Sequence, residues 1–329
     1  MLIDLVIDLG SESLRIYKNG EGMIFDEPSL ALVGGDPGAP VITDVGQSAN
    51  DRALEAAGGG QYGLVRPIKN AGITDVKTAK LFFAECFKRS GVEPSFFDKI
   101  RVVALVGCGL GYAERRLAAD AIKGAGARRV YVVDGLLALY CYSEVDRGFF
   151  VDIGAAAANA GFVAHDGIKT GFQTDVAGNA VNAALRALIE SRYGLTIGAR
   201  SAEKIKRAST VYGVPDGAIR VNGKDAQGNF VSADVYFSDV AACARGVFDE
   251  LIGLLDAAIF GLPVRDRNLV CGSGIFLSGG SAMFAGLPEY LAEKLRLKVS
   301  VVANCREAAV IGAARFYRER GLLKELIKI

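Results

Sequence analysis

Multiple histidines and paired cysteines are missing from this sequence. The 329 residues contain one histidine, His165, and six cysteines that occur singly, without a Cys-x-x-Cys pair. Protein zinc sites draw most of their ligands from closely spaced Cys and His side chains. We therefore expect no zinc site, and we interpret His165 as a surface turn residue rather than a catalytic base.

An excess of charge of either sign is also missing. Lys and Arg number 38, Asp and Glu number 37, and the formal net charge is +1. This balance gives no compositional reason to expect a nucleic-acid partner. The first residues, MLIDLVIDLG, lack the basic segment of a signal peptide, and isolated cysteines are typical of reduced thiols. We predict a cytoplasmic protein without a nucleic-acid partner.

One long uncharged run, residues 269–288, holds five glycines and three serines. That composition favours a loop between a strand and a helix over a membrane-spanning helix. Hydrophobic residues make up 51% of the chain, whose length exceeds the size at which one hydrophobic core stops growing. We therefore expect two domains.

An internal repeat is the main signal for the architecture. Residues 3–24 predict a strand that ends at Asp8-Leu9-Gly10, a second strand, a turn at Asn19-Gly20 and a return strand. Residues 149–172 repeat this order, with Asp152-Ile153-Gly154 at the first bend and Asp166-Gly167 at the turn. Asn-Gly and Asp-Gly are typical of two-residue hairpin turns, in which both central positions need a positive φ.

Each repeat places a carboxylate and a glycine at a tight bend, where successive backbone N–H groups can converge on an anion. Two such bends facing each other would hold a polyphosphate, with Asp8 and Asp152 near its Mg²⁺. The alternative is that both aspartates only cap turns, where Asp is common.

The remaining pattern alternates helices with strands, which implies a mainly parallel sheet in each half. Helical spacing covers residues 77–88, 113–124, 180–193, 202–208 and 238–260, and strands are expected at 101–106, 129–133 and within 218–237. A glycine-rich segment, Leu277 to Ser281, joins a strand to a helix, another natural anion or nucleotide contact.

These segments, in this order, resemble the bacterial actin homologue MreB. The match covers nearly the whole chain, in DLGSESLRIYKNGEGMIFDEPSLAL, LVRPIKNAGITD, GYAERRLAADAIKGAGARRVYVV, LTIGARSAEKIK and LSGGSAMFAGLPEYL. The resemblance implies an α/β actin-like fold, a duplicated ribonuclease H-like fold of two domains with mixed sheets and helices and two smaller outer subdomains. Domain I would comprise residues 1–144 plus 305–329, with its outer lobe near 31–65. Domain II would comprise residues 145–304, with its outer lobe near 179–237.

The resemblance also implies a cytoskeletal protein that polymerises with itself and binds ATP or ADP with Mg²⁺ in an interdomain cleft. It implies that Asp8 and Asp152 approach the Mg²⁺ through water and that Asp134 orients the attacking water. The nucleotide-binding residues implied in the same way are Gly10, Ser11, Glu12, Ser13, Gly154, Ala155, Ala156, Ala157, Gly178, Asn179, Glu203, Lys206, Gly279, Gly280, Ser281, Ala282 and Met283.

The sequence departs from the family at three places in this site. Residues 155–159, Ala-Ala-Ala-Ala-Asn, replace a Gly-Gly-Gly-Thr-Thr type of loop, so Cβ atoms would obstruct positive φ and the approach of phosphate. Asp134-Gly135 replaces a Glu-Pro pair, and Asn179, Asn182 and Ala183 replace acidic residues of the ribose helix. We therefore expect a slow or degenerate ATPase.

Phe96 and Phe97 match the position of the family's small membrane-touching loop, which would bring the protein to the inner face of the cytoplasmic membrane or to membrane-protein partners. Both rings could equally pack inward. The basic residues 204–207 would ordinarily be a solvated helix face, but the resemblance makes Lys206 a nucleotide contact.

Three other functions stay open at this stage. The strand at 101–106 followed by Gly107-Cys108-Gly109-Leu110-Gly111, with Asp134 further on, partly matches a dinucleotide-binding motif, although Tyr112 stands where Gly or Ala is needed. A sugar kinase or chaperone-type ATPase would share the fold, since fold alone does not define function. A filament scaffold that does not hydrolyse nucleotide is the third.

Overall fold

The structure is a computed structural model that describes residues 2–36, 39–55, 62–69, 72–92 and 99–317. The chain divides into two compact units, which are described separately. Unit 1 contains the residues up to Val145 and the segment that begins at Glu307, and unit 2 contains Asp146–Arg306.

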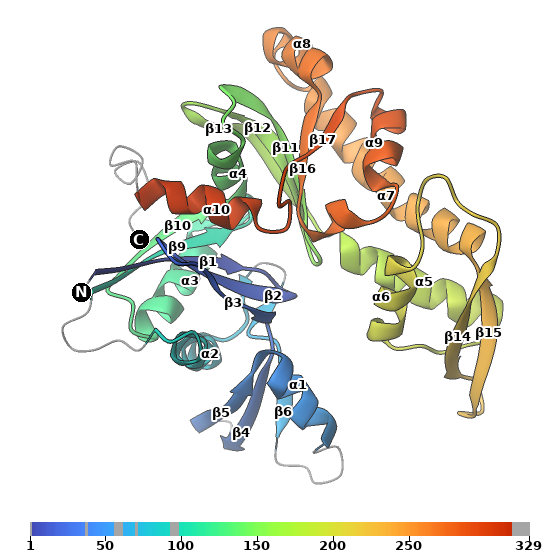
Figure 1. Cartoon of the computed structure of the whole chain (residues 1–329), viewed down its shortest axis with the longest axis horizontal. Helices are drawn as coiled ribbons and strands as arrows, with labels where there is room; N and C mark the ends of the chain where they lie inside the picture. Colours follow the sequence, from blue (N-terminus) through green and yellow to red (C-terminus); the bar gives the residue numbers. More distant parts are fainter. Residues whose placement is uncertain (1, 37–38, 56–61, 70–71, 93–98, 318–329) are drawn as a thin grey trace. The chain divides into compact units, whose positions relative to one another are not determined.

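Unit 1 is built on a five-stranded sheet with the order β10-β9-β1-β2-β3 (Figure 1). The strands β1, β2 and β3 form an antiparallel meander, whereas β9 and β10 join the other edge of β1 in parallel. Their bounds are Leu2–Leu9, Ser13–Lys18, Gly22–Pro28, Lys99–Val106 and Arg129–Asp134.

Helices cover both faces of this sheet, which explains why its central strands are apolar on both sides. On one face, Leu5 and Ile7 of β1 belong to a core that includes Phe82 of α2 and Ile122 of α3. On the other face, Val6 packs in a second core with residues of α4 and α10. The helices are α2 (Val76–Arg89), α3 (Tyr112–Gly124), α4 (Gly135–Ser143) and α10 (Ala308–Ala314), followed by the 3-10 turn η2 (Arg315–Tyr317).

A small lobe follows β3 in the chain. It consists of a three-stranded sheet with the order β5-β4-β6 and the helix α1. Its elements are β4 (Ala31–Asp36), β5 (Ala39–Val45), α1 (Gly46–Glu55) and β6 (Gly63–Val65), and a short hairpin of β7 (Ile68–Lys69) and β8 (Gly72–Ile73) leads on to α2.

Unit 2 repeats the sheet of unit 1, with the order β13-β12-β11-β16-β17. Again three antiparallel strands are followed by two parallel ones, so the internal repeat seen in the sequence corresponds to a duplicated topology. The strands are β11 (Arg147–Ile153), β12 (Ala158–Ala164), β13 (Gly167–Thr174), β16 (Ile275–Ser278) and β17 (Val299–Val301).

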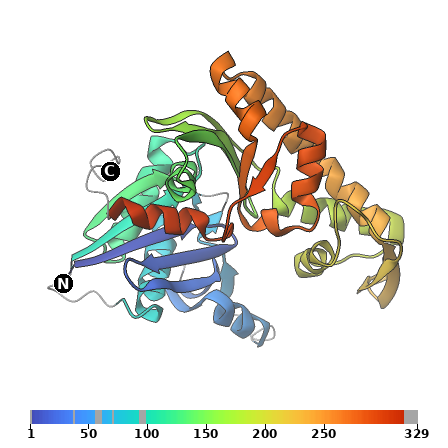
Figure 2. The same ribbon diagram turned by 45° about the horizontal axis from the view of Figure 1, so that its top comes forward.

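The core of unit 2 joins one face of this sheet to α5 and to the long helix α7, through residues such as Val151, Leu185 and Phe248. Figure 2 shows the hairpin β14–β15 at the point where α7 begins. The elements are α5 (Gly178–Tyr193), α6 (Ala199–Arg207), β14 (Ala218–Lys224), β15 (Phe230–Tyr236), α7 (Phe237–Phe260), α8 (Val264–Ser273), η1 (Gly280–Met283) and α9 (Leu287–Leu295).

Three expectations about local structure need correction. Each main sheet is mixed rather than mainly parallel, because the hairpins contribute as many antiparallel pairings as the crossovers contribute parallel ones. Asn19 and Asp166 have negative φ; only the glycines of the turns, Gly20, Gly22 and Gly167, take positive values. Residues 269–288 are not a continuous loop, since they contain the end of α8, all of β16 and η1.

One other expectation is confirmed. His165 is exposed in the turn between β12 and β13. Within the described ranges, no helix combines the length and the apolarity that crossing a bilayer requires.

Candidate functional site

The first hairpin of unit 1 brings Asp8 to the end of β1 and turns sharply at Gly10. A Cβ atom at Gly10 would collide with the carbonyl oxygen of Ser13, so the bend requires glycine. The hydroxyl of Ser29 donates a hydrogen bond of 2.6 Å to the Gly10 carbonyl and ties the bend to the chain beyond β3.

The carboxylate of Asp8 is engaged by Arg15. Arg15 is the cross-strand partner of Asp8, and its Nη1 lies 2.9 Å from Asp8 Oδ2. Burial raises the pKa of Asp8, and the Arg15 guanidinium partly offsets this effect. The sequence motifs did not single out Arg15, although the alternation of side chains along the hairpin places it on the same face as Asp8.

This pairing bears on the expected magnesium site. Mg²⁺ prefers oxygen ligands, and one Asp8 oxygen is already bound to a cation that would repel a divalent ion. Among the described residues, no group of three or more His, Cys, Asp or Glu side chains could hold a metal. A Mg²⁺ ion would meet the Asp8 carboxylate beside the Arg15 charge, and the contact of Asp8 with Mg²⁺ through water stays a prediction.

The second hairpin, in unit 2, has the same bend. The N–H of Gly154 donates to the carbonyl of Ala157 at 2.9 Å, as the tight turn between β11 and β12 requires. Ala155, Ala156 and Ala157 all keep negative φ, so the predicted conflict between alanine and positive φ does not arise. Their Cβ atoms and the missing threonine hydroxyl remain the differences from the family's loop.

Two segments of unit 2 converge on this bend. From the start of α5, Gly178 N–H donates to the Gly154 carbonyl (3.1 Å) and Asn179 N–H donates to the Ala155 carbonyl (2.6 Å). From η1, the Ser281 hydroxyl donates to the same Gly154 carbonyl at 2.9 Å. A Cβ at Gly178 would lie 2.9 Å from Ser281 Oγ, which shows how closely these segments approach.

The turn after β16 lies directly against Asp152. Gly279 has a φ of +90°, and a Cβ there would lie 2.6 Å from Asp152 Oδ1. The N–H of Gly279 donates to the Cys305 carbonyl at 3.0 Å, and the Ser278 hydroxyl donates to the same oxygen at 2.8 Å. These bonds hold the glycine-rich turn beside the carboxylate.

The helix α6 adds a charged pair to the same group of segments. Lys206 is buried, and its Nζ lies 3.2 Å from the Gly178 carbonyl and 2.7 Å from Glu203 Oε2. Asn182 of α5 donates to Glu203 at 2.8 Å, and Arg207 also pairs with it. Although burial alone would raise the pKa of Glu203, hydrogen bonds from these three partners lower it to about 2.

The residues of η1 differ in accessibility. Ala282 is buried, whereas Met283 is 68% exposed. Unit 2 thus brings together nucleotide residues predicted on four separate segments: the bend at Gly154, the start of α5, helix α6 and η1.

Asp134 is buried in unit 1, where it caps a helix and lies beside an arginine. It is 8% exposed and caps α4, where its Oδ1 accepts the N–H of Leu136 at 2.9 Å. Its Oδ2 lies 3.5 Å from Nη2 of Arg115. Burial raises the pKa of Asp134, and the Leu136 N–H and Arg115 act against that rise.

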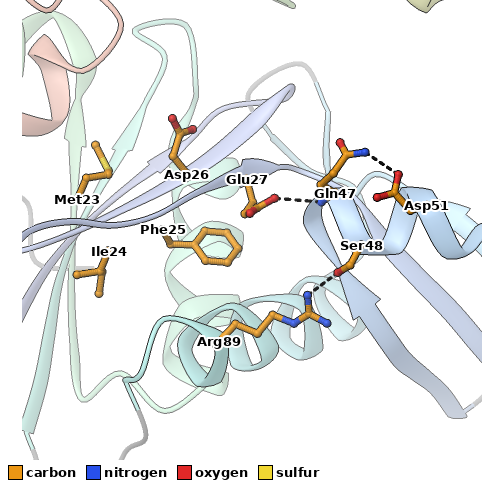
Figure 3. A pocket seen from close by; sticks show the side chains of 9 residues that line it. All are labelled: Met23, Ile24, Phe25, Asp26, Glu27, Gln47, Ser48, Asp51 and Arg89. Atoms are coloured by element: carbon orange, nitrogen blue, oxygen red, sulfur yellow. Dashed lines mark hydrogen bonds between the residues drawn. The ribbon is translucent and has the colours of Figure 1, made fainter.

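A surface groove also occurs in unit 1, at residues that the sequence did not single out. Met23 to Glu27 of β3 line one side, α1 lines the other, and Arg89 reaches in from the end of α2 (Figure 3). Gln47 N–H donates to Glu27, and Arg89 donates to Ser48 and pairs with Asp44. These contacts tie α1 to β3 and to the end of α2. The predicted membrane contacts, Phe96 and Phe97, lie outside the described residues.

The sequence matches a protein-family model described as MreB/Mbl protein over residues 2–325. The chain belongs to the MreB/Mbl family. The predicted resemblance and the actin-like α/β fold are thereby confirmed.

Individual MreB/Mbl relatives are similar along nearly their whole length. The cell shape-determining protein MreB of Escherichia coli (strain K12) is 26% identical over 315 residues, 92% of this chain and 89% of that protein. The cell shape-determining protein Mbl of Bacillus subtilis (strain 168) is 24% identical over 319 residues, 94% of each chain.

Solved structures agree on the fold. MreB5 of Spiroplasma citri bound to AMPPNP has a TM-score of 0.87 at 20% identity, covering 99% of this chain and 98% of that one. The MamK double helical filament has a TM-score of 0.80 at 20% identity, covering 97% of this chain and 99% of that one. Family and fold make this chain an actin-like cytoskeletal protein.

Proposed function

We propose that this protein is a cytoplasmic filament former that binds ATP or ADP through the unit 2 half-site, defined as Asp152 to Ala157, Gly178, Asn179, Glu203, Lys206 and residues 279–283. The observation that carries the proposal is the convergence of these segments on the Gly154 carbonyl. This convergence places the second hairpin bend beside the start of a helix, whose dipole favours an anion such as a phosphate.

The relatives support the choice of ligand. MreB5 of Spiroplasma citri is described in structures bound to AMPPNP and to ADP. We infer an adenine nucleotide here for that reason, with Asp152 as the carboxylate nearest any magnesium ion that the phosphates carry. Contact between the nucleotide and the first hairpin, at Gly10 to Ser13, and the assignment of units 1 and 2 to actin-like domains I and II, stay predictions.

Lys206→Met tests the binding site directly. The substitution removes an ammonium group that links α6 to Gly178, and we expect ATP affinity, measured by calorimetry, to fall by about tenfold or more. Lys204→Met, on the exposed side of the same helix, is the matched control and should leave affinity unchanged. Equal affinities for both variants would remove Lys206 from the site.

Self-association is the second part of the proposal. The MamK structure is a double helical filament, and the MreB and Mbl relatives determine cell shape. Electron microscopy of the purified protein should show filaments whose abundance depends on ATP. A protein that stays dispersed with and without ATP would contradict filament formation.

We further propose that hydrolysis is slow. One oxygen of Asp134 accepts a hydrogen bond in the first turn of α4, and the other lies beside Arg115. These contacts compete with any hydrogen bond by which the carboxylate would orient a water molecule. Phosphate release from filaments should therefore be barely above background. Fast release would contradict this view, whereas complete absence of release from a nucleotide-dependent filament would favour a scaffold that does not hydrolyse ATP.

Membrane contact through Phe96 and Phe97 stays a prediction. Vesicle co-sedimentation of the double alanine variant beside the unchanged protein tests it, and equal bound fractions would end the idea.

A further inference from the structure

The surface groove of unit 1 lies outside the proposed nucleotide half-site and has a chemistry of its own. It runs along β3, the outermost strand of its sheet, and α1 of the small lobe forms its other wall (Figure 3). Its volume of about 660 Å³ is within the range of ligand pockets in proteins. We call it the lobe groove, and its lining residues are Met23 to Glu27, Gln47, Ser48, Asp51 and Arg89.

Alternation along β3 places Phe25 and Glu27 on the same side of the strand. Their cross-strand partners, Ile16 and Leu14, both belong to the core that the sheet shares with α2. Figure 3 shows Phe25 and Glu27 directed toward α2 and Asp26 directed away from it. This side of β3 therefore presents an apolar residue and, two positions further on, a carboxylate.

The carboxylate end of the lobe groove consists of Glu27 and Asp51. Glu27 accepts the Gln47 N–H at 3.1 Å, and Asp51 accepts the Gln47 side-chain amide at 2.7 Å. Asn50 also donates to Asp51, at 3.2 Å. These donors are neutral, and within the described ranges neither carboxylate forms an ion pair. Both negative charges are thus available to a cationic ligand.

Arg89 also lines the lobe groove but does not neutralise that end. It pairs with Asp44 and with Glu85, whose Oε1 lies 3.3 Å from the Arg89 Nε. Asp44 is buried and pairs with Arg52 as well. Because the charge of Arg89 is matched by these partners, the lobe groove keeps an excess of negative charge.

We propose that the lobe groove binds an extended segment of a partner protein that carries apolar and then basic side chains at alternate positions. In an extended chain, residues i and i+2 point to the same side about 7 Å apart, as the side chains of β3 do. The apolar side chains cover Ile24 and Phe25, and the lysines or arginines that follow pair with Glu27 and Asp51. Charge decides for a basic segment, since an acidic one would meet two like charges.

Fluorescence anisotropy of labelled peptides with nucleotide-free protein tests the proposal. The probe has seven residues, the length of β3, with leucine at its first and third positions, lysine at its fifth and seventh, and serine between them. When this peptide is extended, the leucines and lysines lie on one face. The control peptide has the same composition with each lysine directly after a leucine, which puts the two residue types on opposite faces.

The double variant Glu27→Gln with Asp51→Asn removes both charges and keeps acceptors for Gln47. We expect it to weaken probe binding about tenfold, the effect of two partly exposed charge pairs. The matched control is Glu250→Gln with Asp256→Asn, at two exposed positions of α7 in unit 2, which changes the net charge equally and should leave binding unchanged. The unchanged protein should bind the control peptide at least about threefold more weakly than the probe.

Every other outcome would overturn the proposal. Equal affinity of the two double variants would place the probe elsewhere, and equal affinity for the two peptides would reduce recognition to charge alone. Displacement of the probe by spermidine at lower concentration than by unlabelled peptide would assign the lobe groove to a small amine. Absence of probe binding to the unchanged protein would refute the site. Equal thermal unfolding midpoints of the variants show that lost binding is not lost folding.

Discussion

At the scale of single residues, the Asp134 side chain stabilises the fold through helix capping and ion pairing. Replacing it with Ala removes the acceptor for Leu136 N–H and leaves Arg115 without its partner, so we expect a loss of about 1–2 kcal/mol in the free energy of unfolding. Asp134→Asn keeps a capping oxygen and should lose less than half as much. Urea unfolding of both variants checks the prediction, which fails if Asp134→Ala is as stable as the unchanged protein.

Glu203 predicts a pH dependence of stability. Its folded-state pKa of about 2 lies below the ordinary value of 4.5, so the ionised form stabilises the fold. The contribution is present above about pH 4.5 and disappears as pH falls toward 2. Urea unfolding of nucleotide-free protein should therefore show Glu203→Gln less stable than the unchanged protein at neutral pH, with the difference shrinking through this window. A difference that is constant with pH would contradict the role of ionisation.

The sequence predicted functional side chains only where a local motif in the chain marks them. The repeated Asp-x-Gly bends identified Asp8 and Asp152, and glycine content identified the turn at Gly279. Arg15 was missed because its pairing with Asp8 depends on strand register, which one residue of slip would reverse.

At the scale of elements, amphipathic helices were predicted to within a few residues. The pattern at 77–88 corresponds to Val76–Arg89, and that at 238–260 corresponds to Phe237–Phe260. Helix α4, with the sequence GLLALYCYS, was not predicted because it is apolar on nearly every side. Such a helix is packed on several sides and gives no 3.6-residue periodicity.

The contact between α4 and α10 depends on a glycine. A Cβ at Gly312 would collide with the carbonyl oxygen of Ala138 and lie 3.0 Å from Cβ of Tyr142, so Gly312→Ala should force the helices apart and cost about 1–3 kcal/mol. Gly253→Ala is the control: this exposed position in α7 has no atom within 4 Å of the added methyl, and the change should stabilise by about 0.5–1 kcal/mol. Thermal unfolding compares the two, and shifts of the same sign would refute the packing argument.

At the scale of the whole molecule, one topology occurs twice in a single chain. The repeat was visible in the sequence because both copies keep the strand-bend-strand-turn order, and it predicted the duplicated sheets. The small lobe of β4 to β6 was indicated by the family resemblance alone, since its short strands are partly exposed and carry weak patterns. The two copies also differ in the segment that comes after the hairpin, which is a lobe in unit 1 and helix α5 in unit 2.

Hydrogen exchange with and without ADP tests whether the nucleotide binds to one or to both copies of the hairpin. If the proposed half-site binds the nucleotide, amide protection should increase at residues 152–159, at the start of α5 and at 279–283, because these N–H groups meet the ligand or lose mobility. Added protection at 8–15 would extend the site to the first hairpin, as the family resemblance implies. Protection confined to 23–27 and 47–51 would instead assign the ligand to the groove beside the lobe and refute the half-site. The pattern therefore distinguishes a site built from both copies of the hairpin from one that uses only the second.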